Sequence, residues 1–150
     1  MGNICRSPTA EAVFRRVVAT EGGGLRVHVD SAGTHGYHVG DAPDRRAQAA
    51  AARRGYDLSA LRARQLEPAD FERFDWVLFM DERNRRDAAS FLPAAPHAQL
   101  ALLLEFAPGL GRREVPDPYY GGPQGFEDVL DLAEAAARGL LLQLVTRQRR

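Results

Sequence analysis

The fold is decided by the run DWVLFM at residues 75–80, which is almost continuously apolar. A strand with one face in water alternates apolar and polar residues, whereas a run of this kind is typical of a parallel strand that is covered on both faces. We therefore expect a buried parallel strand at 75–80, with helices packed on the sheet to which it belongs.

The segments that follow this run alternate between helical and strand-like patterns. A helix is expected near 82–90, and the apolar run 98–106 predicts a strand of about five residues, although a helix would also fit there. The stretch 116–123 is rich in Pro and Gly and indicates a loop. A last helix is expected from about Phe126 to Val145, because apolar residues recur there at helical spacing.

The segments that precede the run show the same alternation. Residues 43–54 are Ala-rich and predict a helix, and the Gly-containing stretch before them, 31–44, indicates a loop. The run LRVHV at 25–29 alternates and predicts a strand. Apolar residues between 8 and 20 have a helical period, and the glycines at 22–24 end that helix. Strands that alternate with helices in this way indicate an α/β domain with a parallel sheet.

Length and composition restrict the class of protein. We expect 150 residues to form one domain, 1–150. The 20 basic residues balance the 20 acidic ones, so no net charge indicates binding to nucleic acid or to an acidic membrane. A single Cys excludes an internal disulfide, and the four His have no metal-ligand spacing, so no metal is expected. With no signal peptide and no long apolar run, we expect a cytoplasmic protein without a membrane partner.

The first residues, MGNICRS at 1–7, form a loop that leads into the helix beginning near Pro8. Ser7 is a candidate N-cap, and Pro suits the first turn of a helix. Backbone N–H groups at a helix start, together with the guanidinium of Arg6, suit an oxyanion such as phosphate. The sequence therefore predicts a phosphate-binding loop that consists of Gly2, Asn3, Ile4, Cys5, Arg6 and Ser7.

Five motifs support a resemblance to a known family. They are MGNICRS at 1–7, DSAGT at 30–34, RARQL at 62–66, MDERN at 80–84 and DPYYG at 117–121. In this order they resemble the low-molecular-weight protein tyrosine phosphatases over nearly the whole chain. The resemblance implies a three-layer α/β sandwich with a small, four-stranded parallel sheet, and hydrolysis of phosphotyrosine through a phosphocysteine. It also implies phosphotyrosine proteins as substrates, a tyrosine kinase as a further partner, phosphate or sulfate as the bound anion, and no cofactor.

The resemblance also implies roles for individual residues. Arg6 holds the equatorial oxygens of the phosphate, because its planar fork donates two parallel hydrogen bonds. Asp117 matches the general acid that protonates the leaving phenolate and then activates water. Tyr119 and Tyr120 match an aromatic wall beside the substrate ring. Tyr37 stands in the place of the opposite wall, and a role as an ordinary loop residue is equally open for it. None of the four His is expected to be catalytic; His28 is placed on a strand and the other three in solvent.

The single cysteine does not have the spacing of the family's nucleophile. In the family loop the nucleophilic Cys precedes the Arg by six residues, whereas Cys5 is adjacent to Arg6, and Glu11 stands six residues after Cys5. Counting back from Arg6 leads to a position ahead of Met1. We therefore expect the nucleophile and the first, central strand to be missing by truncation, and the 150-residue chain to be inactive. By this spacing Cys5 matches a second cysteine of the family loop and is not expected to be the nucleophile. Its position at a helix N-terminus could still lower the pKa of the thiol.

Two other functions use a loop of this kind, and the single cysteine argues against the second of them. A non-catalytic protein that binds phosphate or phosphotyrosine would use the same amides and Arg6 without attack on phosphorus. An arsenate reductase of the same fold needs further cysteines to resolve its thiol intermediate, and this chain has one. Without its central strand, the chain would expose the edges of neighbouring strands, so we also expect poor solubility.

Overall fold

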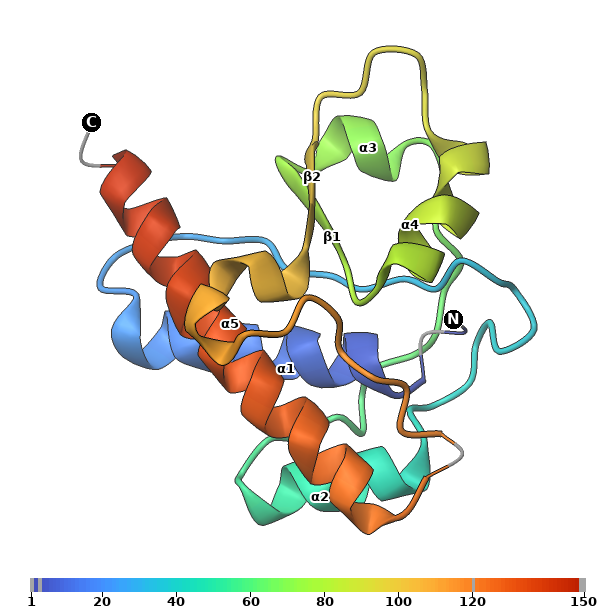
Figure 1. The fold of residues 1–150 in the computed structure, drawn as a ribbon, viewed down its shortest axis with the longest axis vertical. Helices are drawn as coiled ribbons and strands as arrows, with labels where there is room; N and C mark the ends of the chain where they lie inside the picture. The colour runs from blue at the N-terminus through green and yellow to red at the C-terminus, as the bar shows by residue number, and fades with distance from the viewer. Residues whose placement is uncertain (1, 3, 120, 149–150) are drawn as a thin grey trace.

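The computed structural model of the chain describes residues 2, 4–119 and 121–148. Asn3 and Tyr120, two of the predicted site residues, lie outside this range. Figure 1 shows the arrangement of the elements. In chain order they are α1 (Arg6–Glu21), α2 (Arg45–Arg53), α3 (Asp70–Arg73), β1 (Trp76–Phe79), α4 (Glu82–Ala88), η1 (Ala89–Phe91), β2 (Gln99–Leu102), η2 (Leu103–Phe106), η3 (Pro108–Leu110) and α5 (Pro123–Gln148).

The described sheet consists of two parallel strands. β1 and β2 pair in register from Trp76 opposite Gln99 to Phe79 opposite Leu102, and α4 and η1 lie in the crossover between them. A parallel strand is therefore confirmed at 76–79, within the predicted run 75–80, but three of its four residues are only half-buried. The prediction for 98–106 is correct only in its first part, because the chain turns into η2 after Leu102. The Glu105 carboxylate closes that turn by accepting a hydrogen bond from the Leu102 N–H at 2.5 Å.

The strand predicted at 25–29 is wrong, because this segment is extended but unpaired. Leu25, Val27 and Val29 are half-buried and alternate with exposed residues, as a strand would require. Within the described residues, however, only an isolated bridge between Gly33 and Gln65 follows it, and the sheet is β1 and β2 alone. Of the family's four strands, the first was expected to be absent from this chain, and the part of the chain that the structure describes forms two.

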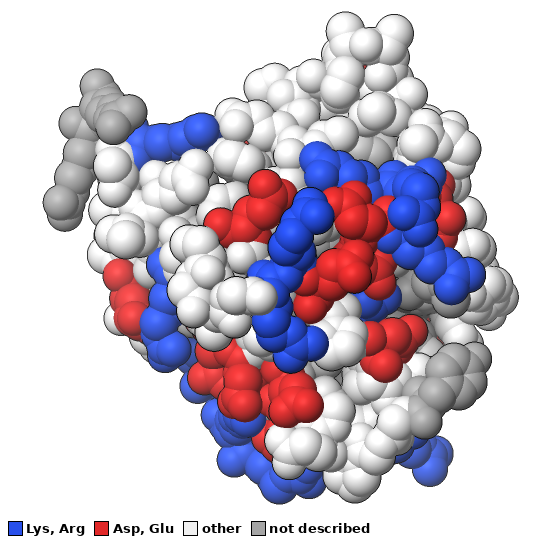
Figure 2. Space-filling model, in the orientation of Figure 1, with Lys and Arg blue, Asp and Glu red and all other residues white. Residues whose placement is uncertain are grey.

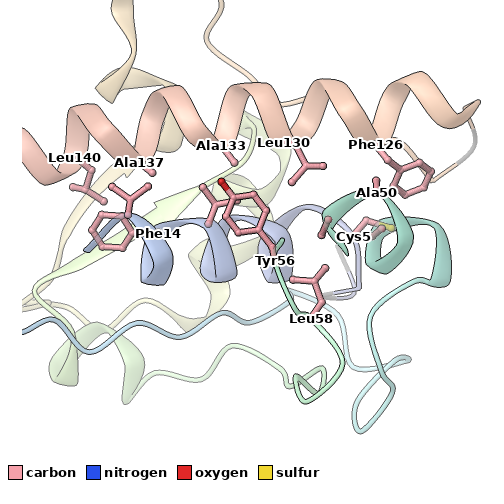
Figure 3. Close-up of a cluster of buried hydrophobic side chains, with 14 of the residues drawn as sticks. Cys5, Phe14, Ala50, Tyr56, Leu58, Phe126, Leu130, Ala133, Ala137 and Leu140 are labelled. Carbon is pink, nitrogen blue, oxygen red and sulfur yellow. The ribbon is translucent and has the colours of Figure 1, made fainter. Parts of the chain in front are cut away.

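Helices α1, α2 and α5 form one layer and enclose the main hydrophobic core (Figure 3). Phe14 of α1, Ala50 of α2 and Leu130 of α5 are among its buried side chains. On the other side of the sheet, Phe71 of α3 packs in a smaller cluster with Phe79 of β1. The result is the expected three-layer α/β arrangement, a small parallel sheet between helices.

The start of α1 differs from the prediction. The helix begins at Arg6, with Cys5 at the N-cap and no side-chain cap, so Ser7 lies in the first turn and is not the N-cap. Pro8 does not prevent this, because proline is tolerated in the first turn, where its missing N–H has no intrahelical partner. The end was predicted correctly, since the Gly22 N–H closes the helix on the Val18 carbonyl.

The surface carries both signs of charge. On the face shown in Figure 2, Arg and acidic side chains are interspersed. Among the described residues, no helix has the length and apolar character that a membrane span requires.

Candidate functional site

The loop ahead of α1 lines a small cavity of about 130 Å³. The residues around it come from separate parts of the sequence, so the fold brings the predicted site together. They are Gly2, Ile4, Cys5, Arg6, Ser7, Tyr37, His38, Asn84, Asp117 and Tyr119. Every predicted site residue that the structure describes therefore lies at one cavity.

Arg6 is held rigidly at the base of this site. Its side chain is buried, and Nη1 donates to Oδ2 of Asp81 and to the carbonyl oxygen of Val115, each at 2.7 Å. Both bonds use Nη1, so among the described residues Nε and Nη2 are left to donate to an anion. Two such donors in one plane match two oxygens of a phosphate.

Asp81, which caps α4 two residues after the end of β1, is the anionic partner of Arg6. Burial would raise the pKa of Asp81, but the hydrogen bonds from Arg6 and from the Asn84 N–H more than offset this effect, so the pKa lies below its usual range. Asp81 therefore stays ionised at neutral pH and orients the guanidinium.

Cys5 belongs to the hydrophobic core more than to the anion site. Its side chain packs near Ala50 of α2 and Phe126 of α5, and the residue is 6% exposed (Figure 3). Burial, together with the nearby carboxylates of Asp44 and Asp117, raises the pKa of Cys5 to about 12. The lowered pKa that a helix N-terminus can give is therefore absent here, and the group is a thiol at neutral pH.

Asp117 stands at the mouth of the cavity and is exposed. Its Oδ1 accepts a hydrogen bond from the Tyr119 N–H at 3.0 Å, which closes a tight turn around Pro118. This bond uses one carboxylate oxygen. An exposed carboxyl group in this place can exchange a proton both with a bound molecule and with water.

Two aromatic side chains flank the opening. Tyr37 is 64% exposed and Tyr119 is 37% exposed, and both line the cavity. The guanidinium of Arg46 lies 5.3 Å from the ring of Tyr119 and 4.9 Å from the ring of Phe126. Because Arg46 also pairs with Asp44 at 3.0 Å, it ties the Tyr119 wall to the start of α2.

The expectation that His38 lies in solvent is wrong. Its ring lines the cavity and packs so closely on Gly2 that a Cβ at that glycine would collide with it. Its Nδ1 is 3.1 Å from Oδ2 of Asp41, and its ring meets that of Tyr37 edge-on at 5.1 Å. Gly2 is therefore required for this close approach of the loop to the cavity wall.

The reasoning from sequence assigned no role to four contributors to the site: Asp81, Asn84, Arg46 and His38. A signal was available for Asp81, because the carboxyl ends of parallel strands meet at one edge of a sheet and this residue follows the strand at 75–80. No local pattern indicated Arg46 or His38, whose contacts depend on the fold. The structure describes no group of three or more His, Cys, Asp or Glu side chains placed to hold a metal ion.

Comparison with known proteins gives the same family from sequence and from structure. The family described as low molecular weight phosphotyrosine protein phosphatase matches residues 1–150. A low molecular weight protein-tyrosine-phosphatase of Streptomyces coelicolor is 46% identical over 143 residues, which cover 93% of this chain and 87% of that protein.

Two solved structures extend the comparison. A protein tyrosine phosphatase from Entamoeba histolytica, with Hepes in its active site, superimposes with a TM-score of 0.92 at 35% identity, over 99% of this chain and 94% of that one. The tyrosine phosphatase Wzb from Escherichia coli K30, in complex with sulphate, gives a TM-score of 0.80 at 28% identity, over 96% and 93%. The chain is thus similar along almost its whole length to tyrosine phosphatases, one of which was solved with a bound sulphate.

Proposed function

Because the chain belongs to the low molecular weight phosphotyrosine protein phosphatase family, we propose that its cavity binds the phosphate of phosphotyrosine in proteins. The observation that carries this proposal is the buried Arg6, whose Nη1 is fixed by Asp81 and Val115, while Nε and Nη2 have no hydrogen bond to another described residue. The flanking rings of Tyr37 and Tyr119 supply apolar surface for an aryl group. Inorganic phosphate or sulfate would occupy the same place as the phosphoryl group.

In a form of the protein that also supplies the attacking cysteine, we propose a reaction of two steps at this site. A thiolate attacks phosphorus, the bond from phosphorus to the phenolic oxygen breaks, and Asp117 gives its proton to that oxygen. Asp117 then takes a proton from a water molecule, and the oxygen of that water attacks phosphorus. The bond between sulfur and phosphorus breaks, which frees the thiolate and releases phosphate. Arg6 holds the equatorial oxygens through both steps, where the negative charge is greatest.

In this proposal Cys5 does not supply the attacking sulfur. Its thiol is buried in the core, its pKa is raised to about 12, and it is adjacent to Arg6. The family's spacing puts the attacking cysteine six residues before Arg6, at a position that the 150 residues do not include. We therefore propose that the 150-residue chain by itself binds phosphate without turnover, as a non-catalytic binder would.

Hydrolysis of para-nitrophenyl phosphate tests the assignment. We expect no turnover by the 150-residue chain, before or after Cys5→Ser. A chain extended so that a cysteine stands six residues before Arg6 should be active, and Asp117→Asn in that chain should lower kcat about 100-fold, since a general acid contributes on this order.

The controls separate the assigned roles. In the extended chain, Cys5→Ser should leave most of the activity, and Asp41→Asn, which alters a carboxylate at the rim, should affect kcat far less than Asp117→Asn. A vanadate-sensitive rate from the 150-residue chain that Cys5→Ser abolishes would contradict the proposal.

A further inference from the structure

Tyr119, one of the two rings at the opening of the phosphate cavity, is supported by a cation that lies outside the cavity. The guanidinium of Arg46 lies over the Tyr119 ring, 5.3 Å from its centroid, and over the ring of Phe126, 4.9 Å from that centroid. Phe126 is 3% exposed and belongs to the main core. Tyr119 lines the cavity, whereas Arg46 is not among the lining residues. Arg46 therefore joins a ring of the cavity wall to the fixed core.

The orientation of this guanidinium is set by Asp44. Nε of Arg46 donates to Oδ1 of Asp44 at 3.1 Å, and Nη2 of Arg46 donates to Oδ2 at 3.0 Å. Two bonds of this kind hold the plane of a guanidinium, which one bond does not. Burial would raise the pKa of Asp44, but the bonds from Arg46 and from the Ala47 N–H lower it below its usual range. Asp44 is therefore ionised at neutral pH and holds Arg46 in place.

Asp44 is in turn tied to the phosphate loop. Its backbone N–H donates to the carbonyl oxygen of Ile4 at 2.7 Å, and its carboxylate caps the start of α2. Ile4 stands two residues before Arg6, whose guanidinium is available to the anion. One chain of contacts, through Asp44 and Arg46, thus sets the position of the Tyr119 ring relative to the phosphate loop.

The opposite wall of the opening is supported differently. Tyr37 is 64% exposed, against 37% for Tyr119. The ring of His35 lies 5.5 Å from the Tyr37 ring and that of His38 lies 5.1 Å from it, and in the described part of the chain no guanidinium lies over Tyr37. A ligand gains more from a wall that is already ordered than from one that binding must order. Tyr119 is therefore the wall on which a bound flat group is expected to pack.

We propose that Arg46 is a positioning residue that gives the cavity its selectivity for phosphate monoesters of aromatic alcohols over those of small alkyl alcohols. An aryl group has a flat apolar face that can pack on a fixed ring. A methyl group is too small to cover the Tyr119 ring, so its phosphate ester does not depend on this support. The inference rests on the proposed function, because it concerns the aryl group of the same substrate.

The affinities of the 150-residue chain for phenyl phosphate and for methyl phosphate test this proposal. NMR titration gives a dissociation constant for each ligand, and their ratio cancels any effect on the phosphate group itself. Arg46→Met removes the cation and its fork, and we expect it to lower the preference for phenyl phosphate about fivefold. Arg45→Met, at the exposed neighbouring residue of α2, removes the same charge and should leave the ratio unchanged.

A second variant tests the same support without altering Arg46. Asp44→Ser keeps an N-cap for α2 but removes the two carboxylate oxygens that orient the guanidinium. We expect it to lower the preference for phenyl phosphate about twofold or more, in the same direction as Arg46→Met. A purely structural role would instead weaken both ligands by the same factor.

The outcomes separate this inference from the proposed function. Equal loss of affinity for both ligands in Arg46→Met would overturn the inference, and so would an unchanged ratio in Asp44→Ser or the same change of ratio in Arg45→Met. The proposed function would stand in each of these cases. Failure of the unaltered chain to bind either ligand would overturn the proposed function, and this inference with it.

Discussion

The phosphate cavity and the groove between segment 25–31 and β1 both reach Ser7 in the first turn of α1, and they are completed by different kinds of contact. In the cavity, side chains from distant segments satisfy one another, as Arg6 does with Asp81 and Val115. In the groove, the walls are edges of extended backbone, and side chains cannot form the regular row of hydrogen bonds that a neighbouring strand would form with them. A polar site can therefore be complete while the sheet beside it is not, because a sheet needs a neighbouring strand.

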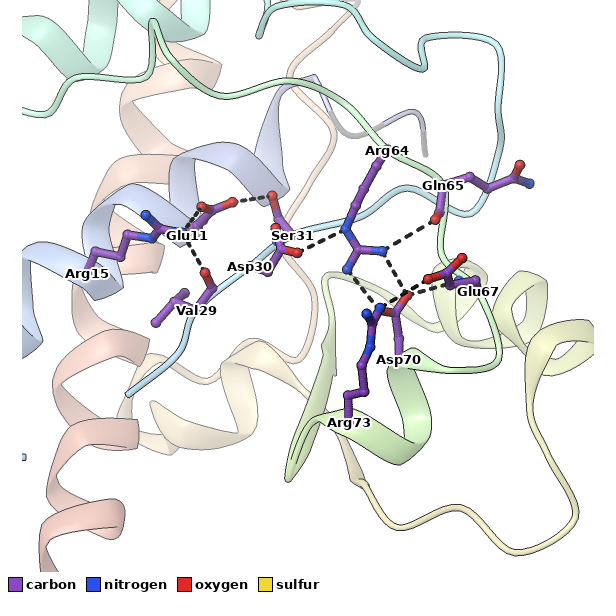
Figure 4. A network of polar contacts seen from close by, with 10 residues as sticks. All are labelled: Glu11, Arg15, Val29, Asp30, Ser31, Arg64, Gln65, Glu67, Asp70 and Arg73. Atoms are coloured by element: carbon purple, nitrogen blue, oxygen red, sulfur yellow. Dashed lines mark hydrogen bonds and ion pairs between the residues drawn. The ribbon is translucent and has the colours of Figure 1, made fainter. Parts of the chain in front are cut away.

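Polar side chains hold the groove together where backbone pairing is absent (Figure 4). Arg64 donates to Asp30 of one wall at 3.0 Å and to Asp70 of α3 at 2.9 Å. Arg15 of α1 donates to the Val29 carbonyl at 2.6 Å. These contacts keep segment 25–31 in place, as Asp81 and Val115 do for Arg6 at the phosphate cavity.

The largest expected difference in stability concerns apolar packing. Val13 is fully buried between helices, whereas Val29 is half-buried beside the groove. Val13→Ala should lower the free energy of unfolding by about 2.5 kcal/mol, because it leaves a cavity in a close-packed core. Val29→Ala should cost less than about 1 kcal/mol, since its surroundings are already open.

Urea unfolding of both variants measures this difference. Equal costs for the two substitutions in the 150-residue chain would show that the groove is filled, and would contradict the comparison.

A smaller effect is expected from the polar contacts around Asp70. Burial would raise the pKa of Asp70, but its bonds with Arg64, Arg73 and the Glu67 N–H lower it below its usual range. A lowered pKa in the folded state stabilises the fold above the unfolded pKa of about 3.9, and this contribution is lost as the pH falls through the folded value.

Asp70→Asn should therefore lower the free energy of unfolding by about 1.5 kcal/mol at pH 7, and the difference from wild type should shrink below about pH 4. Urea unfolding at both pH values measures it. Glu72→Gln, at an exposed residue of the same helix α3, is the control. A loss for Asp70→Asn that is the same at pH 7 and at low pH would contradict the electrostatic explanation.

A structural feature could be predicted from the sequence where residues close together in the chain determine it. The strand at 75–80 and the helix after the first loop follow from apolar spacing, which the chain carries within a few residues. Segment 25–31 has the pattern of a strand and does not become one, because pairing requires a neighbour that no local pattern supplies. Cys5 shows the same limit, since burial against α2 and α5 outweighs the influence of its position at a helix N-terminus.

The residues of the candidate site also fall into a group that could be predicted from the sequence and a group that could not. Arg6, Asp117 and the loop residues were predicted because they stand in motifs with fixed spacing. Arg46 was not, because its contact with the Tyr119 ring joins segments that are far apart in sequence. The motifs therefore predict which groups meet the anion, and the fold decides which groups hold them.

The most direct test of the phosphate site is an NMR titration of the ¹⁵N-labelled chain with inorganic phosphate. We expect saturable shifts of the amide signals of Gly2, Ile4 and Ser7. We also expect Arg6→Lys to weaken binding roughly tenfold or more, because the planar fork is lost while the charge remains. Arg53→Lys, at an exposed residue of α2, should leave the affinity unchanged. Equal affinities for wild type and Arg6→Lys, or shifts confined to other parts of the chain, would contradict the assignment of this site.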